Sequence, residues 1–531
     1  MRRKSLLQGT FILSAAGIVV KIVGALYRIP LTALIGAQGM GLYSLVFPIY
    51  SYLLVFSTTG IPTAISKLVA ESAVTGEGAQ PIFKSSRTLL LWIGAVTSVL
   101  LFCLAGPIAS AVGNPQAAPG IRAIAPALLF VALLSAYRGY FQGMRDMVPT
   151  AVSQVTEQVG RLIFGLYLAW LWMDGGVERG AAGALLGVTL SEALALGLMA
   201  YTYRRIHKER PRSGGTEDKA ARGQAALRML KVAMPITLGA SIMPMVSLVD
   251  SALVVSRLGS IGLPVAESTA QLGLLGGVVN TLVYMPTAIM VALQMSLVPS
   301  VSQSVARGEL HYLRLKSSGS MKLCVLVALP SAVGMLLIAE PMIGTLYRSL
   351  TPAEVQMSAR LLCLSVPGMV FLCVNYATTA ILQGMGDVRS PVKFLALGAV
   401  MKIVLNWVLL GIPSVGIYGA PVGTVVCYAV AMALGAVAVV KKLNLRLDIK
   451  NGLLLPALST ALMGAAVWLL LRFFSGVLPR GALVLLCILA GIVVYAAALL
   501  LTGAATAQDM VLLPKGERIA ALLQKMKLLR R

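Results

Sequence analysis

Long apolar runs alternate with short polar segments along almost the whole chain. A helix of about 20 apolar residues is long enough to cross the hydrocarbon core of a bilayer. The runs are apolar at consecutive positions, which excludes the alternating pattern of a membrane β-barrel and leaves helices as the spanning elements. We therefore predict an all-α, polytopic membrane protein with fourteen transmembrane helices, near residues 10–35, 43–66, 88–112, 121–142, 150–173, 181–203, 231–256, 270–304, 322–347, 357–383, 391–411, 416–440, 452–474 and 481–503.

The first two runs, from Gly9 to Glu71, are separated by a Gly-rich turn at Gly36 to Gly41. Lys21 and Arg28 lie seven residues apart in the first run, so a helix places both on one face, about 10 Å apart. Cations are costly in lipid, and this face is therefore expected to line a polar interior. We interpret the two cations as part of an anion-binding transport cavity.

The composition agrees with a membrane protein, because 58% of the residues are hydrophobic and only 12% are charged. The net charge of +25 follows from topology. With the N-terminus in the cytoplasm, 33 of the 44 Lys and Arg fall in cytoplasmic segments, 7 in outer loops and 4 within spans. Positive residues favour the cytoplasmic side, so we expect a cytoplasmic-membrane protein with both termini inside and no nucleic-acid partner. The outer cations are Arg122, Arg179, Arg257, Arg348, Arg360, Arg472 and Arg480.

An internal repeat relates two halves of the chain. Gln142–Asp146 matches Gln383–Asp387, and at the same offset Arg161 matches Lys402. Gly183, Ala184 and Gly187 resemble Gly419, Ala420 and Gly423, and IPTAISK at position 61 resembles VPSVSQS at position 298. Parallel repeats of this kind place a transport site between two lobes, near the membrane midplane.

The repeat predicts the domain organisation. We expect a six-helix lobe at 1–205, a cytoplasmic linker at 206–227 and a second six-helix lobe at 228–440, followed by two extra transmembrane helices at 441–512. Residues 513–531 carry apolar positions at helical spacing among Lys and Arg, which predicts an amphipathic helix on the anionic inner leaflet. A partner-binding helix is the alternative interpretation of this tail.

Charges within spans are candidates for a cavity or for pairing between helices. They are Lys21, Arg28, Glu157, Arg161, Glu192, Asp250 and Lys402. The i,i+4 spacing of Glu157 and Arg161 predicts an intramembrane ion pair within one helix. Glu192 is expected to pair with a neighbouring helix. Asp250 has two candidate partners, Arg28 and Lys402, and the sequence leaves both open.

Catalytic and metal chemistry is not indicated. The six cysteines are scattered through apolar segments without a CxxC pair and are expected to be small buried residues. The two His lie in polar loops, so we predict no metal site and no cofactor. A membrane glycosyltransferase or polymerase would need catalytic groups in a sizeable outer loop, and the outer loops are short. We therefore expect a transporter and not an enzyme.

The segments GTFILSAAG, GMGLYSLVFP and GIPTAISKLVAE resemble the polysaccharide-flippase family that includes stage V sporulation protein B. This family belongs to the multidrug/oligosaccharidyl-lipid/polysaccharide exporter superfamily. The resemblance implies a flippase for an undecaprenyl-pyrophosphate-linked saccharide, such as lipid II or a related cell-wall precursor. It also implies contact with membrane lipids and with cell-wall synthesis proteins, in a Gram-positive, spore-forming background.

The resemblance extends to site residues. It implies a substrate cavity with Arg28, Lys21 and Asn280, where Asn280 stands near a cavity arginine of the related lipid II flippases. Those flippases also have an acidic residue after the first-span arginine, where this chain has Ile29, and a second-span arginine that has no counterpart here.

Some relatives bind sodium, so the resemblance also implies that transport is coupled to Na⁺ or H⁺. The residues it implies for an ion site, or for coupling between the lobes, are Asp250, Lys402, Asn406 and Thr424. The Lys402 ammonium would replace the ion in such a site. A cation-coupled multidrug exporter of the same superfamily is the alternative function, and an acidic, aromatic-lined cavity would favour it.

Overall fold

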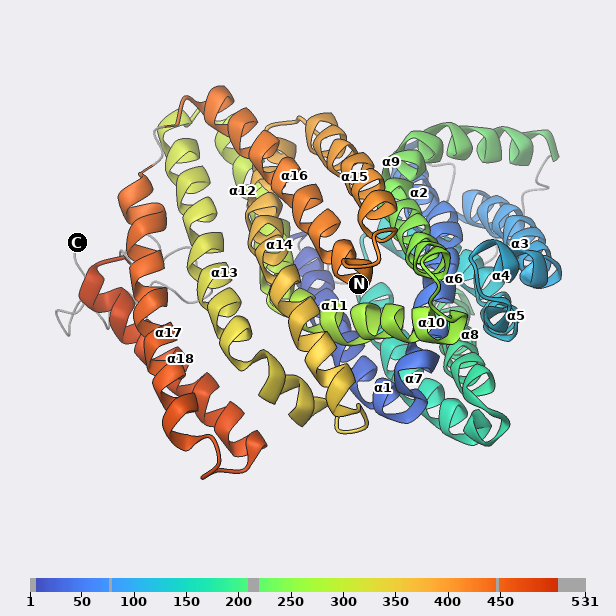
Figure 1. Cartoon of the computed structure of the whole chain (residues 1–531). Coiled ribbons are helices and arrows are strands. Elements are labelled where there is room, and N and C mark those ends of the chain that lie inside the picture. The colour runs from blue at the N-terminus through green and yellow to red at the C-terminus, as the bar shows by residue number, and fades with distance from the viewer. Residues whose placement is uncertain (1–5, 76–78, 209–218, 446–447, 505–531) are drawn as a thin grey trace. The chain divides into compact units, whose positions relative to one another are not determined.

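The structure, a computed structural model, describes residues 6–75, 79–208, 219–445 and 448–504 (Figure 1). Within these ranges the secondary structure is helical, and the only β-type contact is a single bridge between Ser475 and Leu478. The all-α prediction is confirmed. The amphipathic tail predicted at 513–531 lies outside the described residues.

The chain forms two compact units. The first comprises residues 1–277 and 410–417, and the second comprises residues 278–409 and 418–531. The first unit contains α1 (Leu6–Thr58), α2 (Gly60–Thr75), α3 (Gln80–Cys103), α4 (Ala105–Ala111), η1 (Pro115–Ala117), α5 (Ala118–Ile124), α6 (Ala127–Gly143), α7 (Val148–Trp172), η2 (Met173–Gly175), α8 (Val177–Lys208), α9 (Lys219–Ser260), α10 (Val265–Gly273) and most of the π-helix η3 (Leu274–Val279). The second contains α11 (Asn280–Tyr284), α12 (Thr287–Ala306), α13 (Leu310–Leu346), α14 (Pro352–Gly384), α15 (Arg389–Leu409), α16 (Gly419–Leu443), the π-helix η5 (Lys450–Leu454), α17 (Leu455–Phe474) and α18 (Arg480–Thr502). The short η4 (Gly416–Tyr418) lies at the boundary.

Twelve segments of the described chain are long and apolar enough to span a membrane. One of them, Ile22–Ser72, has 51 residues, more than twice the length that one crossing requires. Helix α7 carries Glu157 and Arg161 and is not among the twelve. The count of fourteen spans therefore stays a prediction.

The predicted Gly-rich turn is a kink inside the long helix α1. Gly36 has φ 68° and ψ −178°, a conformation that is strained for any residue with a Cβ. The glycines beyond the kink allow α10 to pack directly on the α1 backbone. A Cβ on Gly41 would lie 1.9 Å from the Thr269 carbonyl oxygen, and a Cβ on Gly273 would lie 2.0 Å from that of Ala37.

The repeated QGMxD segments form the same helix ending twice. After α6, Arg145 is left-handed (φ 60°) and the Asp146 N–H bonds to the Phe141 carbonyl at 2.9 Å. After α14, Gly386 is left-handed (φ 87°) and the Asp387 N–H bonds to the Leu382 carbonyl at 2.9 Å. This 6→1 bond over a left-handed residue is a Schellman ending. Each aspartate then accepts a hydrogen bond from the first turn of the next helix.

The units group the chain differently from the predicted lobes. Helix α9 packs against α1, α2 and α3 within the first unit, although the repeat assigns residues 228–256 to the second lobe. The predicted linker at 206–227 is shorter than expected, because α8 continues to Lys208 and α9 begins at Lys219. The Ala, Lys, Arg and Gln residues at 219–225 favour helix formation. The lobe boundaries of the repeat remain a prediction.

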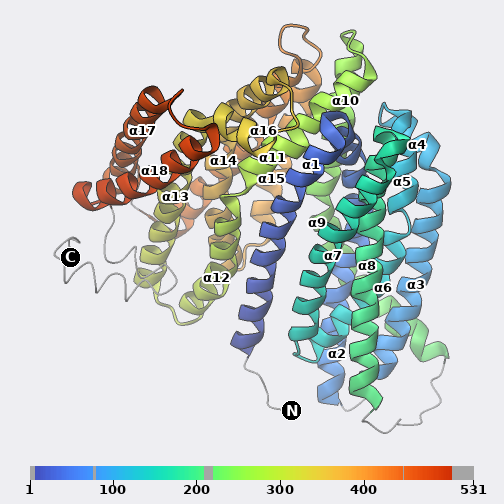
Figure 2. The same cartoon turned by 90° about the horizontal axis from the view of Figure 1, so that it is seen from below.

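The long helices of the first unit run side by side, with α8 packed on α7 and α6, and α3 packed on α6 (Figure 2). This packing largely buries Glu157 and Arg161 of α7 and Glu192 of α8. Four of the six cysteines are buried and Cys363 is partly buried, but Cys103 is exposed, so the expectation of buried cysteines is wrong there. Cys103 is the last residue of α3, at the edge of the unit.

Candidate functional site

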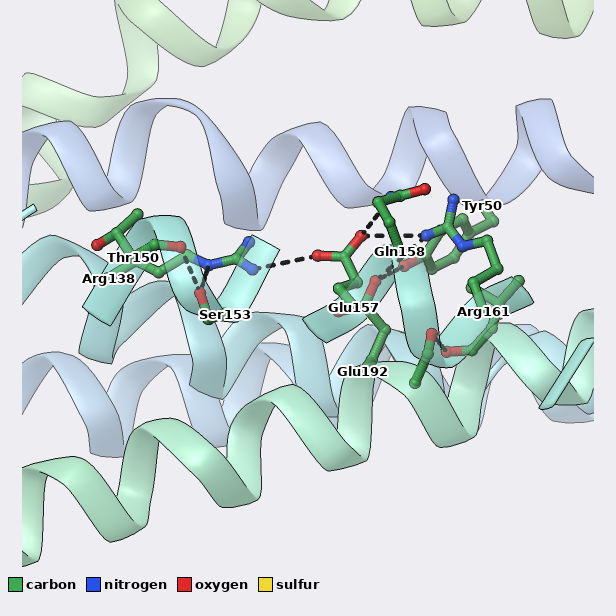
Figure 3. A network of polar contacts seen from close by, with 10 residues as sticks. Tyr50, Arg138, Thr150, Ser153, Glu157, Gln158, Arg161 and Glu192 are labelled. Carbon is green, nitrogen blue, oxygen red and sulfur yellow. Dashed lines mark hydrogen bonds and ion pairs between the residues drawn. The ribbon is translucent and has the colours of Figure 1, made fainter. Parts of the chain in front are cut away.

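Four charged side chains from three helices meet inside the first unit (Figure 3). Glu157 of α7 lies between two guanidinium groups, with Oε2 at 3.1 Å from Nη2 of Arg138 and Oε1 at 3.1 Å from Nη2 of Arg161. Arg161 Nη2 also lies 3.6 Å from Oε1 of Glu192 on α8. We call these four residues the buried charge network.

Polar neighbours support each end of the network. Arg138 Nε donates to Ser153 Oγ at 3.0 Å, and Gln158 Nε2 donates to Glu157 Oε1 at 3.3 Å. The Tyr50 hydroxyl of α1 donates to Glu192 Oε1 at 3.4 Å. The network therefore connects α6, α7 and α8 to the second half of α1.

The burial and charge of the network determine what it can do. The four side chains are between 3% and 14% exposed, and their two positive and two negative formal charges cancel. Within the described chain, Arg161 Nε and Glu192 Oε2 are buried without a hydrogen-bond partner. Removing one partner of a buried pair typically costs about 3–5 kcal/mol, because the other charge stays buried. The network therefore holds four helices in one arrangement.

An aromatic row on α1 lies next to the network. The ring centroids of Tyr27 and Tyr43 are 6.5 Å apart, those of Tyr43 and Phe47 5.4 Å, and those of Phe47 and Tyr50 5.8 Å. The Arg161 guanidinium carbon lies 5.7 Å from the Phe47 ring centroid, within cation–π range. The row links the charge network to the region of the α1 kink.

Arg28 lies in the same unit, half-buried on α1. Its Nη1 donates to the Gly276 carbonyl oxygen at 2.9 Å. Gly276 is part of the π-helix η3, a rare element that often occurs at functional sites. Arg28 and Arg161 are both within electrostatic reach of Tyr27 and Tyr43.

The structure places the other predicted site residues as follows. Lys21 lies on α1, but its side chain is outside the described part of the chain. Asp250 is half-buried on α9 in the first unit, and Asn280 is half-buried at the start of α11 in the second. The i,i+4 ion pair of Glu157 and Arg161 occurs as the spacing suggested.

The remaining predicted residues, Lys402, Asn406 and Thr424, belong to the second unit. Asn406 is fully buried on α15, and Thr424 Oγ1 donates to the Ala420 carbonyl oxygen at 3.1 Å. The predicted ion site draws Asp250 from one unit and these three residues from the other. It therefore stays a proposal.

Sequence reasoning missed Arg138 and Tyr50. The place of Arg138 near the end of its apolar run is typical of a cytoplasmic cation, but Arg138 is inside α6 and pairs with Glu157. One signal was present in the sequence. Glu157 and Glu192 are two carboxylates in spans close to a single arginine, so one buried negative charge lacked a partner.

The described residues contain no group of three or more His, Cys, Asp or Glu side chains that could hold a metal ion.

Comparisons with known proteins give the family. Residues 6–305 match the polysaccharide biosynthesis protein family, and residues 235–408 match the MatE family. Stage V sporulation protein B of Bacillus subtilis (strain 168) is 28% identical over 461 residues, which cover 85% of this chain and 86% of that protein. Lipid II flippase MurJ of the same organism is 27% identical over 498 residues, which cover 88% and 90%.

A similar fold occurs among solved structures. Lipid II flippase MurJ in an inward closed conformation has a TM-score of 0.71 at 16% identity and covers 92% of this chain and 98% of that one. The family match covers more than half of the sequence. The chain therefore belongs to the polysaccharide biosynthesis protein family and is a multi-pass membrane transporter of the multidrug/oligosaccharidyl-lipid/polysaccharide exporter superfamily.

Proposed function

We propose that this protein is a flippase for an undecaprenyl-pyrophosphate-linked saccharide, either lipid II or a related peptidoglycan or polysaccharide precursor. It moves this lipid across the cytoplasmic membrane by alternating access. The observation that carries the proposal is sequence similarity along 85–88% of the chain to stage V sporulation protein B and to a lipid II flippase. Cell-wall synthesis proteins are the partners that such a role implies.

In this proposal Arg28 holds the pyrophosphate. One of its N–H groups is used by the Gly276 carbonyl, at 2.9 Å, which fixes the orientation of the guanidinium. A guanidinium has five N–H donors, so others are left for phosphate oxygens. Lys21 adds a second cation two helical turns away, and Asn280 adds a neutral polar group. Asp250, Lys402, Asn406 and Thr424 bias the lobes or hold a coupling Na⁺ or H⁺.

The buried charge network has a supporting role in this proposal. Its charges cancel, and both carboxylates are already paired with arginines. It is therefore suited to keep the first unit rigid while the protein changes state, and it offers no surplus acid to a cationic substrate. The lack of a surplus acid favours a flippase over a cation-coupled multidrug exporter. The match of residues 235–408 to the MatE family is the observation that supports this alternative.

The test is a leaflet-accessibility assay for lipid II in cells where this protein is the only flippase. The wild-type protein should bring lipid II to the outer leaflet, and Arg28→Ala should stop it at equal expression. Arg28→Lys keeps the charge but loses the planar fork, so we expect partial activity. Lys67→Ala is the matched control, because Lys67 is 60% exposed and only forms a surface pair with Glu71 at 3.8 Å.

Two outcomes would contradict the proposal. Normal activity of Arg28→Ala would remove Arg28 from the pyrophosphate site and leave the flippase function standing. A folded, abundant protein that leaves lipid II inside would exclude lipid II as the substrate. Efflux of cationic drugs under the same expression would then support the alternative function.

A further inference from the structure

A pocket of about 560 Å³ lies in the first unit where α7 turns into α8. Its volume is within the range of small-molecule and headgroup sites. The residues that matter most for its chemistry are Phe102, Arg122, Leu171, Trp172, Arg179 and Leu186. It has no residue in common with the buried charge network or with the surroundings of Arg28.

The pocket contains two arginines without a counter-charge. In the described chain, neither Arg122 nor Arg179 forms an ion pair, and both side chains are exposed. Arg179 folds over Gly175, where an added Cβ would lie 2.4 Å from Arg179 Cδ and 2.9 Å from its Nη1. Glycine at this position therefore lets the guanidinium lie against the η2 turn. Two like charges in one pocket attract an anion.

The aromatic residues at the end of α7 indicate the depth of the pocket in the membrane. Tyr167, Trp170 and Trp172 are 56%, 62% and 37% exposed. Exposed Trp and Tyr gather at the membrane–water interface, at the level of lipid headgroups. Phe102 and Leu171 are about half exposed and add an apolar wall next to the arginines. A ligand in this pocket would therefore contact the arginines on one side and apolar side chains, at the depth of lipid acyl chains, on the other.

The same combination occurs independently in the second unit. A pocket of about 780 Å³ at the α17–α18 turn contains Arg472, Arg480, Trp468 and Phe473. The Arg472 guanidinium carbon lies 5.8 Å from the Trp468 ring centroid. Both pockets are at the helix ends that the Lys and Arg distribution assigns to the outer face.

The outer cations are chemically uniform. All seven are arginines, whereas every lysine of the chain lies in a predicted cytoplasmic segment or within a span. Arginine binds two phosphate oxygens with its planar fork, which the compact lysine ammonium does not do. Four of the seven arginines line the two pockets, two in each pocket. A purely topological rule does not explain this choice of residue.

We propose that the pocket of Arg122 and Arg179 binds the phosphate of an anionic phospholipid in the outer leaflet, with the acyl chain along Phe102 and Leu171. The recurrence of the same pocket in each unit fits a ligand that surrounds the protein, such as phosphatidylglycerol, better than a single transported substrate. The site is separate from the proposed transport function and does not depend on it.

The test counts lipids retained by the purified full chain, by native mass spectrometry in mixed phosphatidylglycerol and phosphatidylcholine micelles. We expect Arg122→Gln/Arg179→Gln to retain one phosphatidylglycerol fewer, with at least about tenfold weaker binding at that site, since two charge-assisted contacts are lost. Phosphatidylcholine retention should not change. Arg348→Gln is the matched control, because Arg348 is an exposed outer arginine in neither pocket.

Three results would overturn the proposal, and a fourth measurement is the folding control. Equal retention of phosphatidylglycerol by the double variant would remove the two arginines from lipid binding. Selective retention of undecaprenyl pyrophosphate in place of phosphatidylglycerol would make the pocket part of the substrate path. Displacement by inorganic phosphate at equal concentration would identify a soluble anion. An unchanged melting temperature in phosphatidylcholine alone would show that the variant is folded.

Discussion

The helix pair α7–α8 of the first unit and the pair α15–α16 of the second cross at matching positions, an arrangement that we call the frame. The two pairs differ in the polar side chains that they carry. Gly187 of α8 crosses α7 at Gly165, and at the matching positions Gly423 of α16 crosses α15 at Asn406. In the first unit this frame carries the buried charge network. In the second, the positions that match Glu157 and Glu192 are Gly398 and Tyr428, and only the match of Arg161, Lys402, is charged.

At the positions that match Glu157 and Glu192, the second unit has a close helix crossing and a tyrosine contact. A Cβ on Gly398 would lie 2.4 Å from the Cys427 carbonyl oxygen, so α15 and α16 approach each other closely at this point. The hydroxyl of Tyr428 lies 3.3 Å from that of Tyr284 on α11, within hydrogen-bond distance. The repeat therefore specifies how helices cross and leaves each unit free to carry its own polar groups.

The largest expected effect comes from Arg161→Ala. It leaves Glu192 buried without a cation and Glu157 with Arg138 alone, so we expect a loss of about 3–5 kcal/mol in unfolding free energy. Tyr428→Phe, at the position that matches Glu192, should cost only about 0.5–1.5 kcal/mol, because it removes one neutral hydrogen bond, the 3.3 Å contact with the Tyr284 hydroxyl. Thermal and denaturant unfolding in detergent micelles measures both.

A double variant sharpens this comparison. Arg161→Ala combined with Glu192→Ala removes both charges, so its cost should be smaller than the sum of the single costs by about 0.5–3 kcal/mol. Strict additivity would mean that the 3.6 Å contact contributes nothing. Equal losses for Arg161→Ala and Tyr428→Phe would mean that the polar groups of the two helix pairs contribute equally to the stability of their own units.

Much of the fold could be predicted because membrane helices are recognised in a sequence by their long apolar runs. The QGMxD match lies where the two units share a backbone feature, because a left-handed residue followed by an N-terminal cap needs a short, defined sequence. One match was misleading. Gly143 packs on Ser66 and Val69, and Gly384 packs on Val298 and Val301, so the contacts align Ser66 with Val298 instead of Ile61.

The candidate site was less predictable because it depends on which helix faces meet. The i,i+4 spacing of Glu157 and Arg161 lies within one helix and could be found locally. The contact of Arg138 with Glu157 requires α6 to pack beside α7, and its place near the end of an apolar run resembled that of a cytoplasmic cation. The placement of α9 in the first unit likewise follows from tertiary packing and not from the order of the repeat.

A smaller effect is expected from adding one methyl group at the two crossings. In Gly187→Ala the new Cβ would lie 2.3 Å from the Gly165 Cα, and in Gly423→Ala it would lie 2.0 Å from Asn406 Oδ1. Overpacking of this kind costs about 1–3 kcal/mol. We expect Gly187→Ala to be the more damaging, because a backbone atom cannot move aside as a side chain can. Melting temperatures of the two variants measure the difference.

The crossing of the second unit also offers a rescue. Adding Asn406→Ala to Gly423→Ala removes the atom that clashes and should recover part of the lost stability. The same strategy has no equivalent at Gly165, which has no side chain to shorten. If Gly423→Ala were tolerated without Asn406→Ala, the close crossing would not be a constraint in the second unit.

The smallest effect concerns the two matching turns. The hydrogen bonds from the Lys442 ammonium and the Ser390 backbone N–H lower the pKa of the Asp387 carboxyl well below its ordinary value. A carboxylate with a lowered pKa stabilises the fold above its ordinary pKa, and this contribution is lost as the pH falls. Asp387→Asn should therefore cost about 0.2–1 kcal/mol at pH 7, the range of a surface ion pair.

The pH dependence separates the ion pair from the cap. Asparagine can still accept the Ser390 N–H, so the penalty of Asp387→Asn reports the loss of the Lys442 contact and should shrink below the ordinary aspartate pKa of about 3.8. Asp146→Asn is the matched control, because Asp146 accepts the Val148 N–H at 3.4 Å in the equivalent turn. If the penalty of Asp387→Asn stayed constant from pH 7 to pH 3, it would be due to a weaker hydrogen bond from the Ser390 N–H and not to the lost contact with Lys442. The two turns would then be equivalent in energy as well as in backbone.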